Sequence, residues 1–383
     1  MTDTVWFLPT MGILVGILIG AVARRNRFCT MAALERYWYA DDSCGLRTWV
    51  LAATVAIVAT QAMIFTGVVD LSGTFYLSAS FGLTGAVTGG LAFGFGMALV
   101  GTCGFGALVR LGGGSLRSLI VLIALGLSAI ATQRGLIAQG RVYVVDNLAI
   151  DLGFAGDQSL GSLLSSGLGF DVRLATASIV VAGLLAWIFA DGNFRRQYTS
   201  IVTGTVIGSA IAAGWLVTSL AARSSFDPVQ LEAGSFVVPV GDVIIQFLAF
   251  TGVMPDYGVG LVLGIVVGAA AVAWNKRDVR WEACDDAREL GRHLLGAFLM
   301  GIGGVFAMGC TVGQGVTAAS VLAISVPFVM ISIAIGARLG LAYLLEGSLA
   351  GLFKPTRRKA AWPMISQKAR AIAGGDRPTN GAA

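Results

Sequence analysis

Charged residues are scarce in this 383-residue chain, at 12% of the sequence against roughly a quarter in soluble domains. It has a single histidine, His293, and five cysteines (Cys29, Cys44, Cys103, Cys284 and Cys310), none of them in a CxxC pair. These absences argue against a zinc site, a disulfide framework and a dithiol redox motif. We therefore expect no metal, no cofactor and no nucleic-acid partner.

Apolar residues and glycine are abundant instead. The chain is 56% hydrophobic and contains 53 glycines, and its mean hydropathy is +0.81. Glycine weakens helices in water, but in lipid it lets helix backbones approach closely. Met1 to Pro9 carry Asp3 and no lysine or arginine, so the first apolar run is predicted to be a retained span rather than a signal peptide. The composition predicts an all-α membrane protein.

Nine apolar runs of about twenty residues are long enough to cross a bilayer. They are predicted as spans at 5–23, 47–69, 83–102, 118–138, 172–190, 198–222, 257–274, 293–310 and 326–346. Shorter apolar stretches lie at 28–40, 104–111, 236–252 and 312–325. We expect re-entrant half-helices there, because such segments are tolerated at membrane depth only inside protein or beside a cavity.

Lysine and arginine predict the orientation, because both favour the cytoplasmic side. Nine spans put the two ends of the chain on opposite sides of the membrane. With the basic tail in the cytoplasm, 21 of the 26 basic residues fall inside, four fall outside (Arg134, Arg141, Arg173 and Arg223), and Arg338 lies within a span. We therefore expect the N-terminus outside and the C-terminus inside, with the tail after Lys354 on anionic membrane lipid or unfolded.

One pattern of glycine and cysteine occurs twice. Glycines stand nine and seven residues before a cysteine and three residues after it; the two sets are Gly94, Gly96 and Gly106 around Cys103, and Gly301, Gly303 and Gly313 around Cys310. Matching glycine interruptions in two halves are typical of transporters with inverted repeats and a site at the bilayer midplane. The fifth span joins the halves, and an odd connector inverts the second half relative to the first.

The repeat divides the chain into four parts. We predict a first membrane repeat at 1–138, an outer loop and connecting span at 139–197, an inverted second repeat at 198–350 and a basic cytoplasmic tail at 351–383. The two repeats are expected to surround a narrow central pathway.

Three cysteines stand where spans give way to half-helices: Cys29, Cys103 and Cys310. Free N–H groups and the positive dipole end at the start of a helix attract anions. We therefore predict that these cysteines bind and conduct an anion. Further candidates neighbour them in the sequence: Thr102, Gly104, Gly106, Thr311, Gly313 and Gln314.

Cysteine at these positions also indicates the chemistry of the cargo. A neutral thiol is a weak, polarizable donor, which suits a soft sulfur-bearing anion. A helix start also lowers the pKa of a thiol, which would permit transient sulfur exchange, and the sequence leaves both roles open. The plainer alternative is a small buried apolar residue. It fits Cys44 and Cys284, whereas the repeat argues against it for Cys103 and Cys310.

At these residues the chain resembles the YeeE/YedE family of sulfur-compound transporters. The resemblance rests on Arg27-Phe-Cys29, Gly101-Thr-Cys103-Gly-Phe-Gly106 and Met308-Gly-Cys310-Thr-Val-Gly-Gln-Gly315, and it covers nearly the whole chain up to about residue 350. In that family three cysteines line a narrow central path and the best-known members take up thiosulfate. The resemblance implies the same role for Cys29, Cys103 and Cys310. It also implies an inner-membrane location and a small cytoplasmic sulfur carrier of the TusA type as partner.

Uptake of thiosulfate or a related sulfur anion is thus the predicted function, with another sulfur or selenium compound as the alternative cargo, because Gln314 stands where the family often has histidine. Two other classes compete with it. A membrane thiol–disulfide enzyme would need paired cysteines, and a scaffold subunit would leave the cysteines merely buried. The sequence indicates no energy source, since it contains no ATP-binding motif and no intramembrane carboxylate suited to a proton relay.

Overall fold

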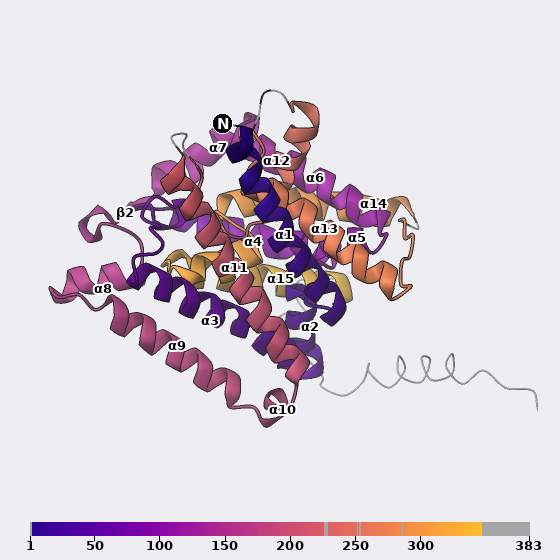
Figure 1. The fold of residues 1–383 in the computed structure, drawn as a ribbon. Helices are drawn as coiled ribbons and strands as arrows, with labels where there is room; N and C mark the ends of the chain where they lie inside the picture. The colour runs from indigo at the N-terminus through magenta and orange to yellow at the C-terminus, as the bar shows by residue number, and fades with distance from the viewer. Residues whose placement is uncertain (1, 226–228, 251, 253, 285, 347–383) are drawn as a thin grey trace, which may run out of the picture.

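Helices make up most of the described chain in the computed structural model of the protein (Figure 1), which describes residues 2–225, 229–250, 252, 254–284 and 286–346. The helices are α1 (Thr2–Asn26), α2 (Thr30–Ala40), α3 (Cys44–Phe65), α4 (Leu83–Val100), α5 (Gly104–Gly112), α6 (Leu116–Gln133), α7 (Leu136–Val144), α8 (Leu160–Leu168), α9 (Arg173–Phe189), α10 (Gly192–Arg195), α11 (Tyr198–Ser224), α12 (Val238–Leu248), α13 (Tyr257–Asn275), α14 (Ala287–Phe306) and α15 (Ser325–Glu346). Short 3₁₀ turns lie at Phe75–Leu77 (η1), Asp146–Leu148 and Gly153–Ala155, and η4 (Gly313–Ala318) is a π-helical stretch.

The prediction of an all-α membrane protein is confirmed. Within the described residues, seven helical segments are long and apolar enough to cross a membrane. Each of the nine predicted spans coincides with a helix, but α9 has only 17 residues and α14 begins with charged residues such as Arg288 and Glu289. The number of nine crossings therefore stays a prediction.

The four predicted half-helices are also helical. They correspond to α2, α5, α12 and the segment 311–320 that contains η4. The outer loop 139–171 has more structure than its composition indicated. It holds α7, α8 and β2 (Ile150–Asp151), which pairs antiparallel with β1 (Ser80–Phe81). The predicted tail at 351–383 lies outside the described residues.

Glycine brings the backbones of α1 and α13 into direct contact. A Cβ added to Gly12, Gly16 or Gly20 of α1 would lie 2.3–2.4 Å from a carbonyl oxygen of α13. In return, a Cβ at Gly260, Gly264 or Gly268 of α13 would lie 2.1–2.3 Å from a carbonyl oxygen of α1. Real Cβ atoms essentially never come so close, so the packing of these two helices depends on glycine.

Helices of the two predicted repeats pack on each other reciprocally. The first span of each repeat packs on the second span of the other, as α1 on α13 and α11 on α3. Likewise, the third span of each repeat packs on the fourth span of the other, as α4 does on α15 and α14 does on α6. The domain boundaries and the inverted repeat stay predictions, which this exchange of partners supports.

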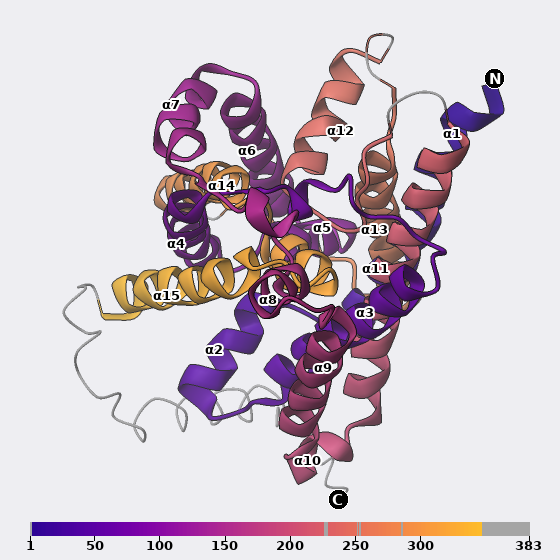
Figure 2. The ribbon, with the colours of Figure 1, turned by 90° about the vertical axis from the view of Figure 1, so that its left-hand side faces the viewer.

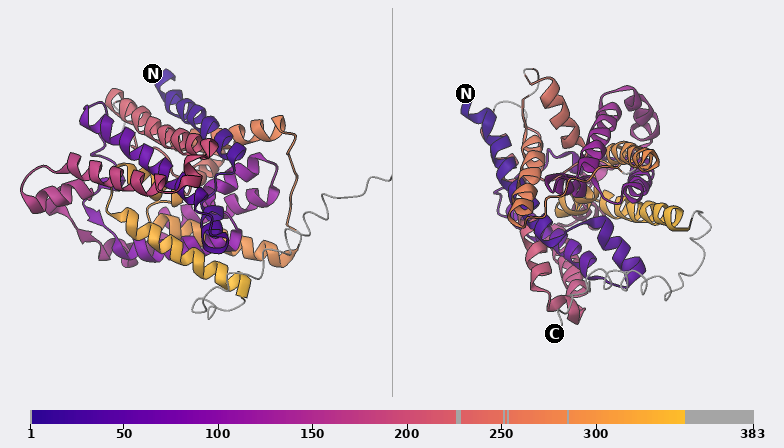
Figure 3. Two further views of the ribbon diagram at one scale, coloured as in Figure 1. Left: turned by 90° about the horizontal axis from the view of Figure 1, so that it is seen from below. Right: turned by 90° about the vertical axis from the view of Figure 1, so that its right-hand side faces the viewer.

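The arrangement leaves apolar side chains on the outside. Leu18 of α1, Leu127 of α6, Val267 of α13 and Ile331 of α15 are exposed, as suits lipid-facing surfaces. The helices α7 and α12 lie at one end of the bundle and α10 at the other (Figure 2). Two further views place α1 and α11 on one side of the molecule and α15 on the opposite side (Figure 3). The half-helices α5 and η4 lie in the core between them.

Candidate functional site

The three candidate cysteines share one local structure. Two residues before each of them the backbone is left-handed: φ is 54° at Arg27, 77° at Gly101 and 54° at Met308. Each left-handed residue lies at the C-terminal end of a helix, namely α1, α4 or α14. At α1 and α14 the next residue closes the helix end: the Phe28 amide donates to the Ala23 carbonyl, and the Gly309 amide donates to the Gly304 carbonyl. A left-handed residue then turns the chain so that a cysteine begins the next helix.

Each cysteine is the N-cap of the half-helix that follows. The carbonyl oxygens of Cys29, Cys103 and Cys310 accept the first helical hydrogen bond from Ala33, Ala107 and Gln314, at 3.0, 2.9 and 2.8 Å. The prediction from sequence that the cysteines stand at helix breaks is confirmed by this geometry. Three helix N-termini, each with a positive dipole end, therefore begin at a cysteine.

The structure brings the three cysteines together. Thr30, which follows Cys29, and Thr311, which follows Cys310, have their hydroxyl oxygens 3.4 Å apart, and the Cys103 thiol lies within electrostatic range of both other thiols. Cys29 Sγ lies 4.0 Å from Thr102 Oγ1, and the amide of Gly313 donates to Cys310 Sγ over 3.3 Å. We call the group of Cys29, Thr102, Cys103, Thr311 and Cys310 the waist. Cys103, Cys310 and Thr311 are fully buried, and Cys29 is half-buried.

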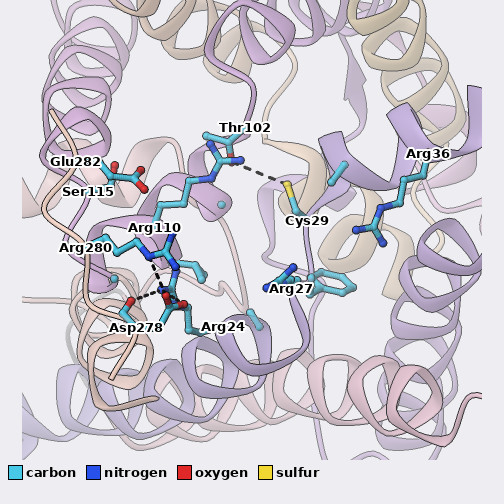
Figure 4. Close-up of a pocket in the computed structure, with 16 residues that line it drawn as sticks. Arg24, Arg27, Cys29, Arg36, Thr102, Arg110, Ser115, Asp278, Arg280 and Glu282 are labelled. Atoms are coloured by element: carbon cyan, nitrogen blue, oxygen red, sulfur yellow. Dashed lines mark hydrogen bonds and ion pairs between the residues drawn. The ribbon is translucent and has the colours of Figure 1, made fainter. Parts of the chain in front are cut away.

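A cavity of about 410 Å³ opens at the Cys29 end of the waist (Figure 4). Cys29, Thr102 and Gly106 form its inner wall. Five arginines line it, Arg24, Arg27, Arg36, Arg110 and Arg280, together with the acidic residues Asp278 and Glu282. Arg24 pairs with Asp278 over 3.2 Å, as does Arg280, whereas Arg27, Arg36 and Arg110 are exposed around Cys29. The excess of positive charge favours an anion at this end of the waist.

A second cavity, of about 300 Å³, approaches the Cys310 end. Met308 and Gly309, which precede Cys310, form part of its wall with Ser235. The ionisable residues that line this cavity are Arg141, Asp146, Glu232, Asp242 and Asp256. Arg141 pairs with Asp146 over 3.4 Å. The predicted outer residues Arg141 and Asp146 thus lie at the end of the waist opposite the predicted inner residues, so the two groups are on different sides of it.

The glycines of the candidate site make room at the waist. A Cβ on Gly106 would lie 2.2 Å from Thr102 Oγ1 and 3.6 Å from Cys29 Sγ, and one on Gly104 would lie 3.1 Å from the Phe236 carbonyl oxygen. Gly313 lies at the Cys310 end, where a Cβ would be 3.2 Å from the Tyr76 hydroxyl.

The side-chain amide of Gln314, a predicted donor to the transported anion, is hydrogen-bonded to groups of the protein instead. Its Nε2 donates to the carbonyls of Ala307 and Met308, at 2.8 and 3.3 Å, and its Oε1 accepts from Ser325 over 3.1 Å. The amide is therefore engaged in fixing the turn before Cys310.

Four residues near the waist were not predicted from the sequence. Thr30 Oγ1 donates to Thr311 Oγ1 over 3.4 Å. Tyr76 and Ser235 lie beside Gly313, and Glu232 is buried in the connector between α11 and α12, where it accepts from the Gly258 amide over 2.8 Å. Tyr76 and Glu232 come from connectors that were assigned no role, and the only available signal was an aromatic or acidic residue within a loop.

The waist can hold an anion without offering it a formal opposite charge. Its side chains are neutral hydroxyls and thiols, and the helix starts supply partial positive charge. Three aromatic rings pack beside it. The ring centroid of Phe105 lies 6.2 Å from that of Phe28 and 5.1 Å from that of Phe236. Such a site favours a soft anion with weak, reversible binding, which conduction requires.

Comparisons with known proteins agree with this chemistry. A family model described as "Sulphur transport" matches residues 25–339. The chain is 24% identical over 320 residues to the thiosulfate transporter TsuA of Spirochaeta thermophila, covering 82% of this chain and 92% of that protein. It is 27% identical over 327 residues to the thiosulfate transporter TsuA of Escherichia coli, covering 79% and 85%.

Proposed function

The chain belongs to the sulphur-transport family, and we propose that it takes up thiosulfate, or a closely related sulfur anion, through the waist. The observation that supports this proposal is the group of three cysteines, each at the start of a helix, with one cavity beside Cys29 and another beside Gly309. Two relatives that match most of the chain are named thiosulfate transporters.

Thiosulfate suits the waist because the anion has two kinds of surface. Its terminal sulfur is soft and polarizable, like a thiol, and its oxygens are hard hydrogen-bond acceptors. The thiols of Cys103 and Cys310 can meet the sulfur, and the hydroxyls of Thr102 and Thr311 can meet the oxygens. Sulfite and selenite share part of this chemistry and are the alternative cargoes.

The location of the protein forms part of the proposal. We place it in the bacterial inner membrane with the N-terminus outside, which puts the arginine-lined cavity in the cytoplasm. That cavity would draw the anion inward and offer a basic docking surface to a small cytoplasmic sulfur carrier of the TusA type.

Uptake of labelled thiosulfate into liposomes that contain the purified protein tests the proposal. Loss of one hydrogen bond to an anion costs about 1.5–3 kcal/mol, so Cys29→Ala, Cys103→Ala and Cys310→Ala should each slow uptake about 10- to 100-fold. Cys284→Ala is the matched control, because Cys284 is a free cysteine that lines none of the cavities reaching Cys29. Wild-type rates in all three waist variants would refute the pathway.

Unlabelled competitors in the same liposomes identify the cargo. Thiosulfate should compete most strongly, sulfite and selenite less, and sulfate least, because sulfate lacks a soft atom. A thiol–disulfide enzyme would instead turn over a reducible substrate in detergent, and a scaffold subunit would show no uptake without a partner.

A further inference from the structure

Tyr76 comes from a connector, yet its side chain lies in the core. The segment between α3 and α4 turns inward at η1, and Tyr76 is only 2% exposed there. Its ring packs edge-on against Trp215 of α11, with the centroids 6.3 Å apart. The ring is therefore held in a fixed position by packing, and its hydroxyl is fixed with it.

The hydroxyl of Tyr76 lies at the Cys310 end of the waist. A Cβ on Gly313 would be 3.2 Å from the Tyr76 hydroxyl and 3.3 Å from Ser235 Oγ, so both hydroxyls lie beside the same glycine. The amide of that glycine donates to Cys310 Sγ over 3.3 Å. Tyr76 is also close enough to Cys310 for the two side chains to interact electrostatically. Two hydroxyls therefore lie beside Gly313, whose amide donates to the Cys310 thiol.

Ser235 offers the Tyr76 hydroxyl its only side-chain hydrogen bond among the described residues, and the geometry of that contact is too poor to satisfy the hydroxyl. Leaving a buried hydroxyl unpaired destabilises a protein, and such groups are uncommon. A phenylalanine would fill the same space without this cost. The packing of the ring therefore does not account for the hydroxyl, which is free to bond to a group that enters the site.

The cavity on this side of the molecule leads to the same point. Ser235 and Gly309 line it, while Tyr76 and Cys310 lie one layer deeper. An anion that moves from the cavity towards Cys310 meets Ser235 first and the Tyr76 hydroxyl next.

Part of the negative charge of this cavity is offset: Asp146 pairs with Arg141 over 3.4 Å. Glu232 lines the cavity in the connector between α11 and α12, and burial, together with the neighbouring Asp256, raises the pKa of its carboxyl well above 4.5. A raised pKa favours the neutral acid in this position.

We propose that Tyr76 and Ser235 form an oxyanion subsite on the cavity side of Cys310, where their hydroxyls bind the oxygens of a small sulfur oxyanion while the thiol faces its terminal sulfur. This inference rests on the proposed function, and it names the residues that would let the protein distinguish thiosulfate from sulfate. Thiosulfate satisfies the hydroxyls and the thiol together, whereas sulfate satisfies only the hydroxyls.

Tyr76→Phe is the decisive variant, because it removes only the unpaired hydroxyl. The Michaelis constant for thiosulfate uptake in liposomes should rise about 10- to 100-fold, the loss typical of one hydrogen bond to an anion. Ser235→Ala should act in the same direction. The melting temperature of Tyr76→Phe in detergent should equal or exceed that of the wild type, since the variant removes an unsatisfied buried group.

Tyr257→Phe is the matched control. Its hydroxyl is also buried and without a partner among the described residues. It lies beside Gly214, where a Cβ would be 2.6 Å away, and it lines neither cavity. This variant should leave the Michaelis constant unchanged.

Three outcomes separate the subsite from the proposed function. Weaker uptake in Tyr76→Phe with Tyr257→Phe unaffected supports the subsite. Wild-type kinetics in Tyr76→Phe, with Cys310→Ala inactive, overturns the subsite and leaves the pathway standing. Wild-type kinetics in Tyr76→Phe and in all three of Cys29→Ala, Cys103→Ala and Cys310→Ala overturns the two together.

Discussion

Gly106→Ala tests whether cargo passes between Thr102 and Cys29. The added Cβ would lie 2.2 Å from Thr102 Oγ1, which is about 1.2 Å closer than the 3.4 Å at which ordinary contact begins. Thr102 is 2% exposed and tightly packed, so it must turn its hydroxyl away from Cys29 or towards the opening. The new methyl group also lies 3.6 Å from Cys29 Sγ. The variant therefore narrows the waist at its Cys29 end.

Two opposing contributions decide how Gly106→Ala changes the stability of the fold. Overpacking a site usually costs about 1–3 kcal/mol, whereas alanine in place of glycine in a helix gains about 0.5–1 kcal/mol. The fold should therefore survive with little change in stability. A barrier raised by about 1.4 kcal/mol slows passage tenfold. We expect initial rates of thiosulfate uptake in liposomes to fall about tenfold or more.

Two further variants show whether a fall in rate is steric. Gly183→Ala, in α9, adds a methyl group to open space and should leave uptake unchanged. Thr102→Ala combined with Gly106→Ala removes the clashing oxygen and should recover part of the rate. If folded Gly106→Ala protein transports at the wild-type rate, cargo does not pass beside Cys29 and the reasoning is wrong.

The remaining predictions concern stability in detergent. Gly264→Ala should lower the melting temperature relative to Gly183→Ala, because its Cβ would lie 2.3 Å from the Ile13 carbonyl oxygen of α1; equal values would show that α1 and α13 can separate freely. Burial raises the pKa of Glu232 above 4.5, so its stabilising contribution is complete below that pH and is lost as pH rises through the raised value. Glu232→Gln should flatten this pH dependence in melting curves, and an unchanged slope would contradict it.

The positions of the three cysteines could be predicted from the sequence because chemistry and local structure coincide there. A glycine pattern around Cys103 and Cys310 predicted helix breaks, and each cysteine caps a half-helix. Cys29 was found without the pattern, because basic residues and a short apolar run mark the same kind of break. Such signals are local, so a single sequence can show them.

Contacts between distant segments could not be predicted in this way. Gln314 was expected to face cargo, but its amide is engaged by Ala307, Met308 and Ser325, which only the fold brings together. Tyr76 lies in a connector and reaches the core through packing on Trp215. Glu232 has no helical or hydropathy signal at all. In each case the decisive neighbour is far away in the chain.

The glycine contacts between α1 and α13 also bear on how the molecule works. Where peptide groups touch directly, few side chains can rearrange to let one helix slide over the other, and a close-packed interface resists small displacements. Because α1 belongs to one predicted repeat and α13 to the other, this seam opposes rocking of the two halves. Passage of the anion would then depend on small rotations of side chains such as Thr102, while the helices around the waist keep fixed positions.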